Sequence, residues 1–139
     1  MSKTVSPSAL PNQYITPNLQ VYEISCKCGC GYKALSLELA EMFQRARVLF
    51  GDAISVTSGC RCVKHNSSAA VKGKPDSAHL VGLALDVKPA KNNTPLRRIR
   101  LFECLKQAGF VRIGVPKNEN LRIFHVDIDK SKPQGIFEY

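Results

Sequence analysis

The chain has 139 residues, 44% of them hydrophobic, and its 20 Lys and Arg against 11 Asp and Glu give a formal charge of +9. This length and apolar content predict one domain with a sizeable core, and no apolar run is long enough to cross a bilayer. The charge indicates an anionic partner, but the basic residues are scattered and no nucleic-acid-binding motif accompanies them. An acidic cell envelope is therefore a better candidate than a specific nucleic acid, with simple solubility as the alternative.

The first 20 residues carry three of the eight prolines, at positions 7, 11 and 17. We expect an extended arm over residues 1–20 and a single domain over residues 21–139. The N-terminus has no apolar segment of the signal-peptide type, so we expect a protein made in the cytoplasm without a signal peptide.

Two helices are expected. Ser36 can cap the first, over residues 37–50, and Gly51 can end it. The second runs from Thr94-Pro95 to Gly109. One face of the first helix should pack in the core, because apolar residues recur there at helical spacing: Leu39, Met42, Phe43, Ala46 and Leu49.

Short strands are expected between and after the helices, separated by a polar loop over residues 63–78 and a turn over residues 116–120. Together they predict an α+β fold, a small and mainly antiparallel sheet packed against two helices. The expected strands span residues 54–57, 83–87, 110–115 and 124–128.

Two of these strands carry polar residues among apolar ones. Asp86 alternates with apolar residues in the strand over residues 83–87, as do His125 and Asp127 in the strand over residues 124–128. If the two strands pair, Asp86 and His125 meet on the face of the sheet opposite the core. For each residue alone, simple exposure to solvent is the plain alternative.

A third polar residue, His79, lies shortly before the first of these strands, and Gly82 lets the chain turn back closely. His79, Asp86 and His125 then offer two imidazoles and one carboxylate. Three such ligands can make a catalytic Zn²⁺ site whose fourth position is open to water.

The spacing of these residues resembles that of a known enzyme family. The chain is similar to the zinc peptidases of the D-alanyl-D-alanine carboxypeptidase family in the motif Ser77-x-His79-x-x-Gly82-x-Ala84-x-Asp86, followed by His125-x-Asp127. That family includes L-alanyl-D-glutamate endopeptidases and phage endolysins and has the hedgehog/DD-peptidase fold. The resemblance covers about residues 15–130 and implies that His79, Asp86 and His125 bind zinc.

Two earlier segments support the resemblance. Residues 56–66 are similar to the family segment "TSGYR…N", with Cys60 where a tyrosine is usual, and residues 23–31 are similar to an N-terminal element of some members. Arg61 matches the family arginine that faces the substrate, which implies binding of a peptide carboxylate or an oxyanion. A surface salt bridge is the alternative for Arg61, and Ser77 either binds substrate or stabilises the turn at His79.

The general base is where the chain departs from the family. Many members place a carboxylate three residues before the second histidine, where this chain has Arg122, which cannot accept a proton. Asp127, on the same face as His125, is our first candidate for the base, and Glu119, in the preceding turn, is the second. The alternatives are that Asp127 orients a ligand and that Glu119 is ordinary surface charge.

Six cysteines leave several interpretations open. The Cys-x-Cys-x-Cys spacing of Cys26, Cys28 and Cys30 is closer than the usual ligand spacing of zinc fingers, which argues against a second metal site. One interpretation is a disulfide from this loop to Cys60 or Cys62, and another is reduced thiols in a protein made in the cytoplasm. The sixth, at position 104, is expected in the core.

The resemblance implies a hydrolase, a zinc metallopeptidase that cleaves peptidoglycan stem peptides as a carboxypeptidase or an endopeptidase, and we expect a monomer. Such an enzyme without a signal peptide reaches the cell wall after lysis, through a holin pore or with a virion, which indicates a bacteriophage origin. The main alternative is a non-catalytic wall-binding or virion structural module that retains the metal site. A nucleic-acid binder is a third hypothesis and rests on charge alone.

Overall fold

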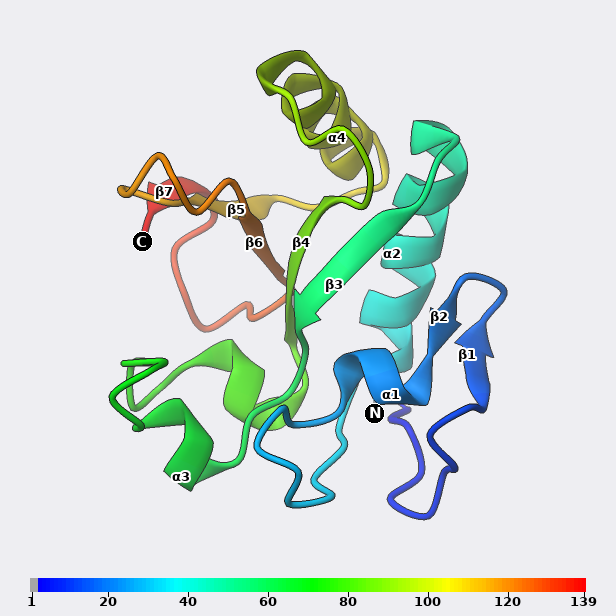
Figure 1. The fold of residues 1–139 in the computed structure, drawn as a ribbon, viewed down its shortest axis with the longest axis vertical. Coiled ribbons are helices and arrows are strands. Elements are labelled where there is room, and N and C mark those ends of the chain that lie inside the picture. Colours follow the sequence, from blue (N-terminus) through cyan, green and yellow to red (C-terminus); the bar gives the residue numbers. More distant parts are fainter. Residues whose placement is uncertain (1–2) are drawn as a thin grey trace.

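A five-stranded sheet with the strand order β3-β4-β6-β5-β7 forms the centre of the protein, whose computed structural model describes residues 3–139 (Figure 1). Neighbouring strands are antiparallel except β5 and β7, which are parallel. The expected α+β class and the four expected strands are confirmed, and β7 is a strand that the sequence analysis did not predict. In sheet order the strands span Ile54–Ser58, Ala84–Pro89, Phe124–Asp127, Arg112–Val115 and Gly135–Glu138.

Two long helices pack together against one face of this sheet (Figure 1). Helix α2 (Leu37–Phe50) begins after Ser36, whose side chain accepts a hydrogen bond from the Leu39 amide, and it ends at Gly51 with a left-handed φ of 74°. Helix α4 (Pro95–Gln107) begins after Thr94, which caps it in the same way. Both predicted helices are therefore confirmed, with α4 ending two residues before Gly109.

The buried face of α2 differs from the prediction at one position. Leu49 is 42% exposed, whereas Phe50 is only 3% exposed and completes the apolar face. Leu49 lies roughly 80° around the helix from the centre of that face, so its side chain reaches past the edge of the core. The other four members of the predicted face are buried: Leu39, Met42, Phe43 and Ala46.

The N-terminal segment packs on the domain through apolar residues. Val5 and Leu19 belong to the same buried core as the helices and the sheet. Strands β1 (Tyr14–Thr16) and β2 (Leu19–Gln20) pair in this segment, and helix α1 (Val21–Ile24) follows directly. Residues 1 and 2 of the expected arm lie outside the described residues, and the division of the chain at residue 20 stays a prediction.

Two short helical turns complete the chain on the side of the sheet that carries the polar residues: α3 (Val63–Asn66) and the 3₁₀ helix η1 (Ala78–Val81). The first lies within the expected polar loop over residues 63–78, and the second leads into β4. Within residues 3–139, every helix is too short or too polar to cross a membrane.

Candidate metal centre

Strands β4 and β6 bring two of the expected ligands face to face. Asp86 of β4 is the direct partner of His125 in the antiparallel register, as the alternation of the two strands predicted. His125 Nδ1 lies 3.3 Å from Asp86 Oδ1. The neighbours Leu85 and Val126 are fully buried in the core, so alternation along each strand directs the polar side chains to the opposite face.

The turn η1 supplies the third candidate ligand, His79. Ser77 caps this turn by accepting a hydrogen bond from the His79 amide at 3.2 Å, and Gly82 ends it with a φ of 72°. A Cβ at Gly82 would lie 2.6 Å from the backbone of Ala34, so only glycine allows this close approach. The His79 side chain is 2% exposed, and its Nε2 lies 3.2 Å from Asp86 Oδ1.

Hydrogen bonds fix which nitrogen of each ring faces Asp86. His79 Nδ1 lies 2.6 Å from the Gly59 carbonyl oxygen, which can only accept, so Nδ1 donates there and Nε2 faces Asp86. His125 Nε2 lies 2.6 Å from a carboxylate oxygen of Asp127, so it donates there and leaves Nδ1 facing Asp86. His79 Nε2 and His125 Nδ1 therefore point toward the same Asp86 oxygen.

This donor set fits a zinc ion. The ligand atoms of His79, Asp86 and His125 all lie within 4.8 Å of one another. Zinc–nitrogen and zinc–oxygen bonds of about 2.0–2.1 Å in a tetrahedron separate neighbouring ligand atoms by about 3.3 Å, which matches the 3.2 Å and 3.3 Å contacts to Asp86. A proton or a metal cation has to lie between each facing nitrogen and Asp86 Oδ1, and two imidazoles with one carboxylate are a common catalytic zinc set.

Asp127 lies behind His125 and away from solvent, with 1% of its side chain exposed. Its Oδ2 accepts from His125 and also from Arg112 Nε at 2.9 Å, and its Oδ1 accepts from the Asp129 amide at 3.1 Å. Burial raises the pKa of the Asp127 carboxyl, but the hydrogen bond and charge of His125, the Asp129 amide and the charge of Arg112 together outweigh burial and hold this pKa below its ordinary value. Asp127 is thus an ionised carboxylate, and both of its oxygens accept hydrogen bonds from protein groups.

The His125 imidazole responds to the same contacts. Burial lowers its pKa, but the hydrogen bonds to Asp127 and Asp86 and the negative charges of these two carboxylates together outweigh burial and raise the pKa above its ordinary value. For the Asp86 carboxyl, burial raises the pKa, while hydrogen bonds to His125 and His79 hold it well below its ordinary value. Asp86 is therefore ionised over the working pH range.

Arg61 contacts the outer oxygen of Asp86. Its guanidinium donates to Asp86 Oδ2, to the Ser58 hydroxyl and to the Asn66 side-chain oxygen, each at 3.2 Å. These contacts orient the Asp86 carboxylate so that Oδ1 faces the two histidines. The family segment that contains Arg61 and Asn66 is therefore one connected network beside the candidate metal site.

Two residues that bear on the identity of the general base lie on the surface: Glu119, its second candidate, and Arg122, at the position where many family members have a carboxylate. Glu119 is exposed in the connection between β5 and β6, and within residues 3–139 its side chain makes no hydrogen bond or ion pair. Arg122 is also exposed, with a left-handed φ of 53°. Neither contacts His79, Asp86 or His125 in the described hydrogen-bond network.

Two aromatic residues beside the site were missed by sequence reasoning. The rings of Phe137 and Tyr139 lie 5.5 Å and 6.1 Å from the His125 ring, measured between centroids. Gly114, the direct partner of His125 in β5, makes room for them, because a Cβ there would lie 2.7 Å from the Phe137 ring. A glycine inside an apolar strand was the available signal for such a close approach.

Comparison with known proteins agrees with this geometry. Residues 17–127 match the Peptidase M15 family, whose members are zinc enzymes that act on peptides. No curated protein and no solved structure matches the chain significantly. The matched segment contains all three candidate ligands and covers most of the 139 residues, so the protein belongs to the Peptidase M15 family of metallopeptidases.

Proposed function

We propose that the protein is a zinc-dependent peptidase that cleaves the stem peptides of peptidoglycan. The observation that carries the proposal is the convergence of His79, Asp86 and His125 in a member of a metallopeptidase family. His79, Asp86 and His125 would hold the zinc ion, which would supply Lewis-acid polarisation of the scissile carbonyl and a bound water with a pKa near 7.

The surrounding residues have positioning roles in this proposal. Asp127 accepts a hydrogen bond from His125 Nε2 and so turns Nδ1 toward the metal site, and Arg61 donates to the outer oxygen of Asp86. Each nitrogen of the Arg61 guanidinium already donates one hydrogen bond within the protein. A substrate carboxylate would therefore have to accept from the remaining N–H groups of Arg61. The rings of Phe137 and Tyr139 border the site beside His125.

Glu119 is our remaining candidate for the general base. Both oxygens of the buried Asp127 carboxylate already accept hydrogen bonds, from His125, Arg112 and the Asp129 amide, which favours the orienting role for Asp127. Glu119 has a free carboxylate on the connection that leads directly into β6. Glu119→Gln should therefore lower kcat and leave zinc binding unchanged, and unchanged kcat would exclude this role.

The proposal includes the bacterial cell wall as the place where the enzyme acts. The formal charge of +9 suits adsorption to an acidic cell envelope, and delivery after lysis, through a holin or with a virion suits an enzyme of bacteriophage origin. Cleavage as an endolysin-type endopeptidase or as a carboxypeptidase leaves different peptide fragments.

One experiment tests activity, metal dependence and the bond together. Purified peptidoglycan is digested with the protein, with and without a chelator, and the released fragments are identified by mass spectrometry. We expect new peptide ends with the zinc protein, none with chelator, and none with His79→Ala. His65→Ala is the matched control, since His65 lies on α3 outside the proposed site. Full activity of His79→Ala would contradict the proposal.

A non-catalytic wall-binding module is the second candidate, and Arg122 in place of the family carboxylate is the observation that favours it. Such a module would retain zinc and bind peptidoglycan fragments but release no new amino groups. Binding without release in the same digestion would favour this function over catalysis.

A further inference from the structure

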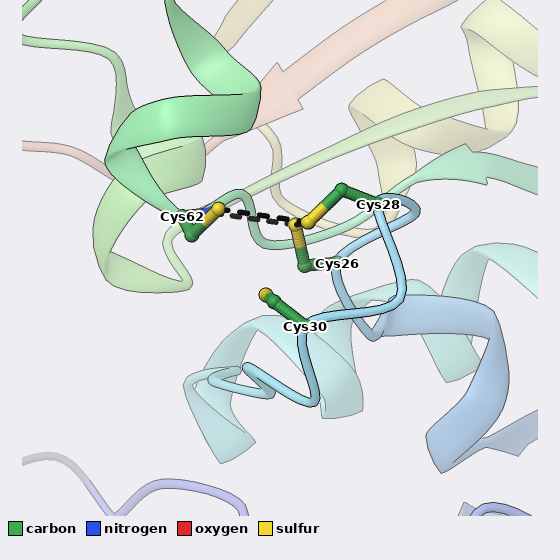
Figure 2. A group of neighbouring side chains, drawn as sticks. All are labelled: Cys26, Cys28, Cys30 and Cys62. Atoms are coloured by element: carbon green, nitrogen blue, oxygen red, sulfur yellow. Dashed lines mark hydrogen bonds between the residues drawn. The ribbon is translucent and has the colours of Figure 1, made fainter.

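Four of the six cysteines meet at a place outside the His–Asp–His site. Cys26, Cys28 and Cys30 come from the loop after α1, and Cys62 lies at the start of α3; their side chains point toward one another (Figure 2). The four sulfur atoms all lie within 4.8 Å of one another. All six cysteines are free thiols in this structure, and Cys60 and Cys104 are not part of the cluster.

The spacing of the sulfur atoms suits a tetrahedral metal ion. Cys26 Sγ lies 3.4 Å from Cys28 Sγ, which lies 3.7 Å from Cys62 Sγ. Zinc–sulfur bonds of about 2.3 Å place the corners of a tetrahedron about 3.8 Å apart. The cluster therefore needs shifts of about 1 Å at most to hold an ion in four thiolates.

Backbone amides also point at these sulfur atoms. The amides of Cys62, Tyr32 and His65 donate to the sulfur atoms of Cys26, Cys30 and Cys62, each at 3.4 Å. Such donors stabilise the negative charge of thiolates that bind a metal. Three of the four sulfur atoms thus have a partner that favours the ionised form.

Two glycines explain how closely spaced cysteines converge. In an extended strand, alternate residues lie roughly 7 Å apart, too far for one small ion. Here Gly29 and Gly31 follow Cys28 and Cys30 with left-handed φ values of 81° and 87°, which fold the loop back on itself. The close spacing that argued against a zinc finger is therefore compatible with a metal site in this loop.

We propose that Cys26, Cys28, Cys30 and Cys62 bind a second zinc ion through four thiolates. The site joins the loop after α1 to the start of α3. Cys62 directly follows Arg61, whose guanidinium holds Asp86 at 3.2 Å. The ion therefore anchors the backbone beside Arg61 and has a positioning role for the candidate catalytic site. Zinc is the preferred occupant because soft thiolates in a tetrahedral arrangement select it.

The test counts zinc and identifies its ligands without using peptidase activity. The protein is purified under reducing conditions and loaded with zinc, bound metal is measured by mass spectrometry, and X-ray absorption reports the ligand atoms. We expect two zinc ions per wild-type chain and one in the His79→Ala/His125→Ala variant. That remaining ion should have four sulfur neighbours at about 2.3 Å.

The reverse variant removes the two exposed thiols, which lie outside the core. Cys28→Ser/Cys30→Ser should keep a single zinc ion bound by nitrogen and oxygen atoms. Cys104→Ala, which removes a buried thiol of α4, is the matched control and should keep two. A reduced wild-type chain that binds only one zinc ion without sulfur ligands would overturn the proposal, as would two zinc ions in Cys28→Ser/Cys30→Ser. The histidine variant separates this result from the proposed peptidase, because it has no catalytic site and still keeps the sulfur-bound zinc.

Discussion

Replacing Asp127 by asparagine removes a negative charge behind His125 and leaves the size of the side chain unchanged. The carboxylate accepts hydrogen bonds from His125 and Arg112 on one oxygen and from the Asp129 amide on the other. An asparagine NH₂ group faces at least one of these donors in either orientation, so one contact becomes repulsive. Losing a hydrogen bond to a charged group costs about 1.5–3 kcal/mol, and removing the partner behind a metal-bound histidine weakens metal binding roughly 10–100-fold.

We therefore expect Asp127→Asn to raise the zinc Kd by roughly 10–100-fold, and activity to return largely when zinc is saturating. Competition with a chromogenic chelator gives the Kd, and hydrolysis at increasing zinc gives the recovery. Asp52→Asn is the matched control, because Asp52 also pairs with an arginine, Arg97 at 2.8 Å, but lies outside the site. If Asp127→Asn bound zinc like the wild type and stayed inactive at saturating zinc, Asp127 would be the base and the orienting role would be wrong.

Three further predictions follow from single contacts. Gly82→Ala should lower the free energy of unfolding by at least about 1–3 kcal/mol in denaturant titration, since φ is 72° and the new Cβ meets the backbone of Ala34; an unchanged midpoint would contradict this. Gly114→Ala should lower the free energy of unfolding by about 1–3 kcal/mol and raise KM, because the new Cβ displaces the Phe137 ring, while the zinc content stays at the wild-type level. In the metal-free protein, the pKa of folded His125 is raised, so its stabilisation is complete below pH about 6.5 and is lost as pH rises through the folded pKa. Unfolding measured in chelator between pH 6 and 8 should show this loss, and His125→Gln should abolish the slope.

The central pair of strands was predictable because their polar residues obey the period of a strand. Asp86 and His125 alternate with apolar residues that the core requires on the other face, and a one-residue slip in register would turn the polar side chains into the core. His79 was predictable through the family motif, and Gly82 was the local signal for the turn. These are short-range patterns, which a single sequence retains.

The features that the sequence did not predict depend on contacts between residues far apart in the chain. Strand β7 pairs in parallel with β5 and brings Phe137 to the site, and its own pattern carries no sign of that partner. The choice of Cys62 over Cys60 as the partner of the cysteine loop depends on where the chain turns after β3. Cys60 is fully buried and accepts a hydrogen bond from the Ala34 amide, while Cys62 faces the loop.

The position of β6 in the sheet has a consequence for folding during synthesis. β6 lies between β4 and β5, although both precede it in the chain, and Asp86 meets His125 through the pairing of β4 with β6. Helix α4 and strand β5 separate the two residues along the chain. A nascent chain therefore cannot complete the three-residue site until β6 has left the ribosome and paired with β4.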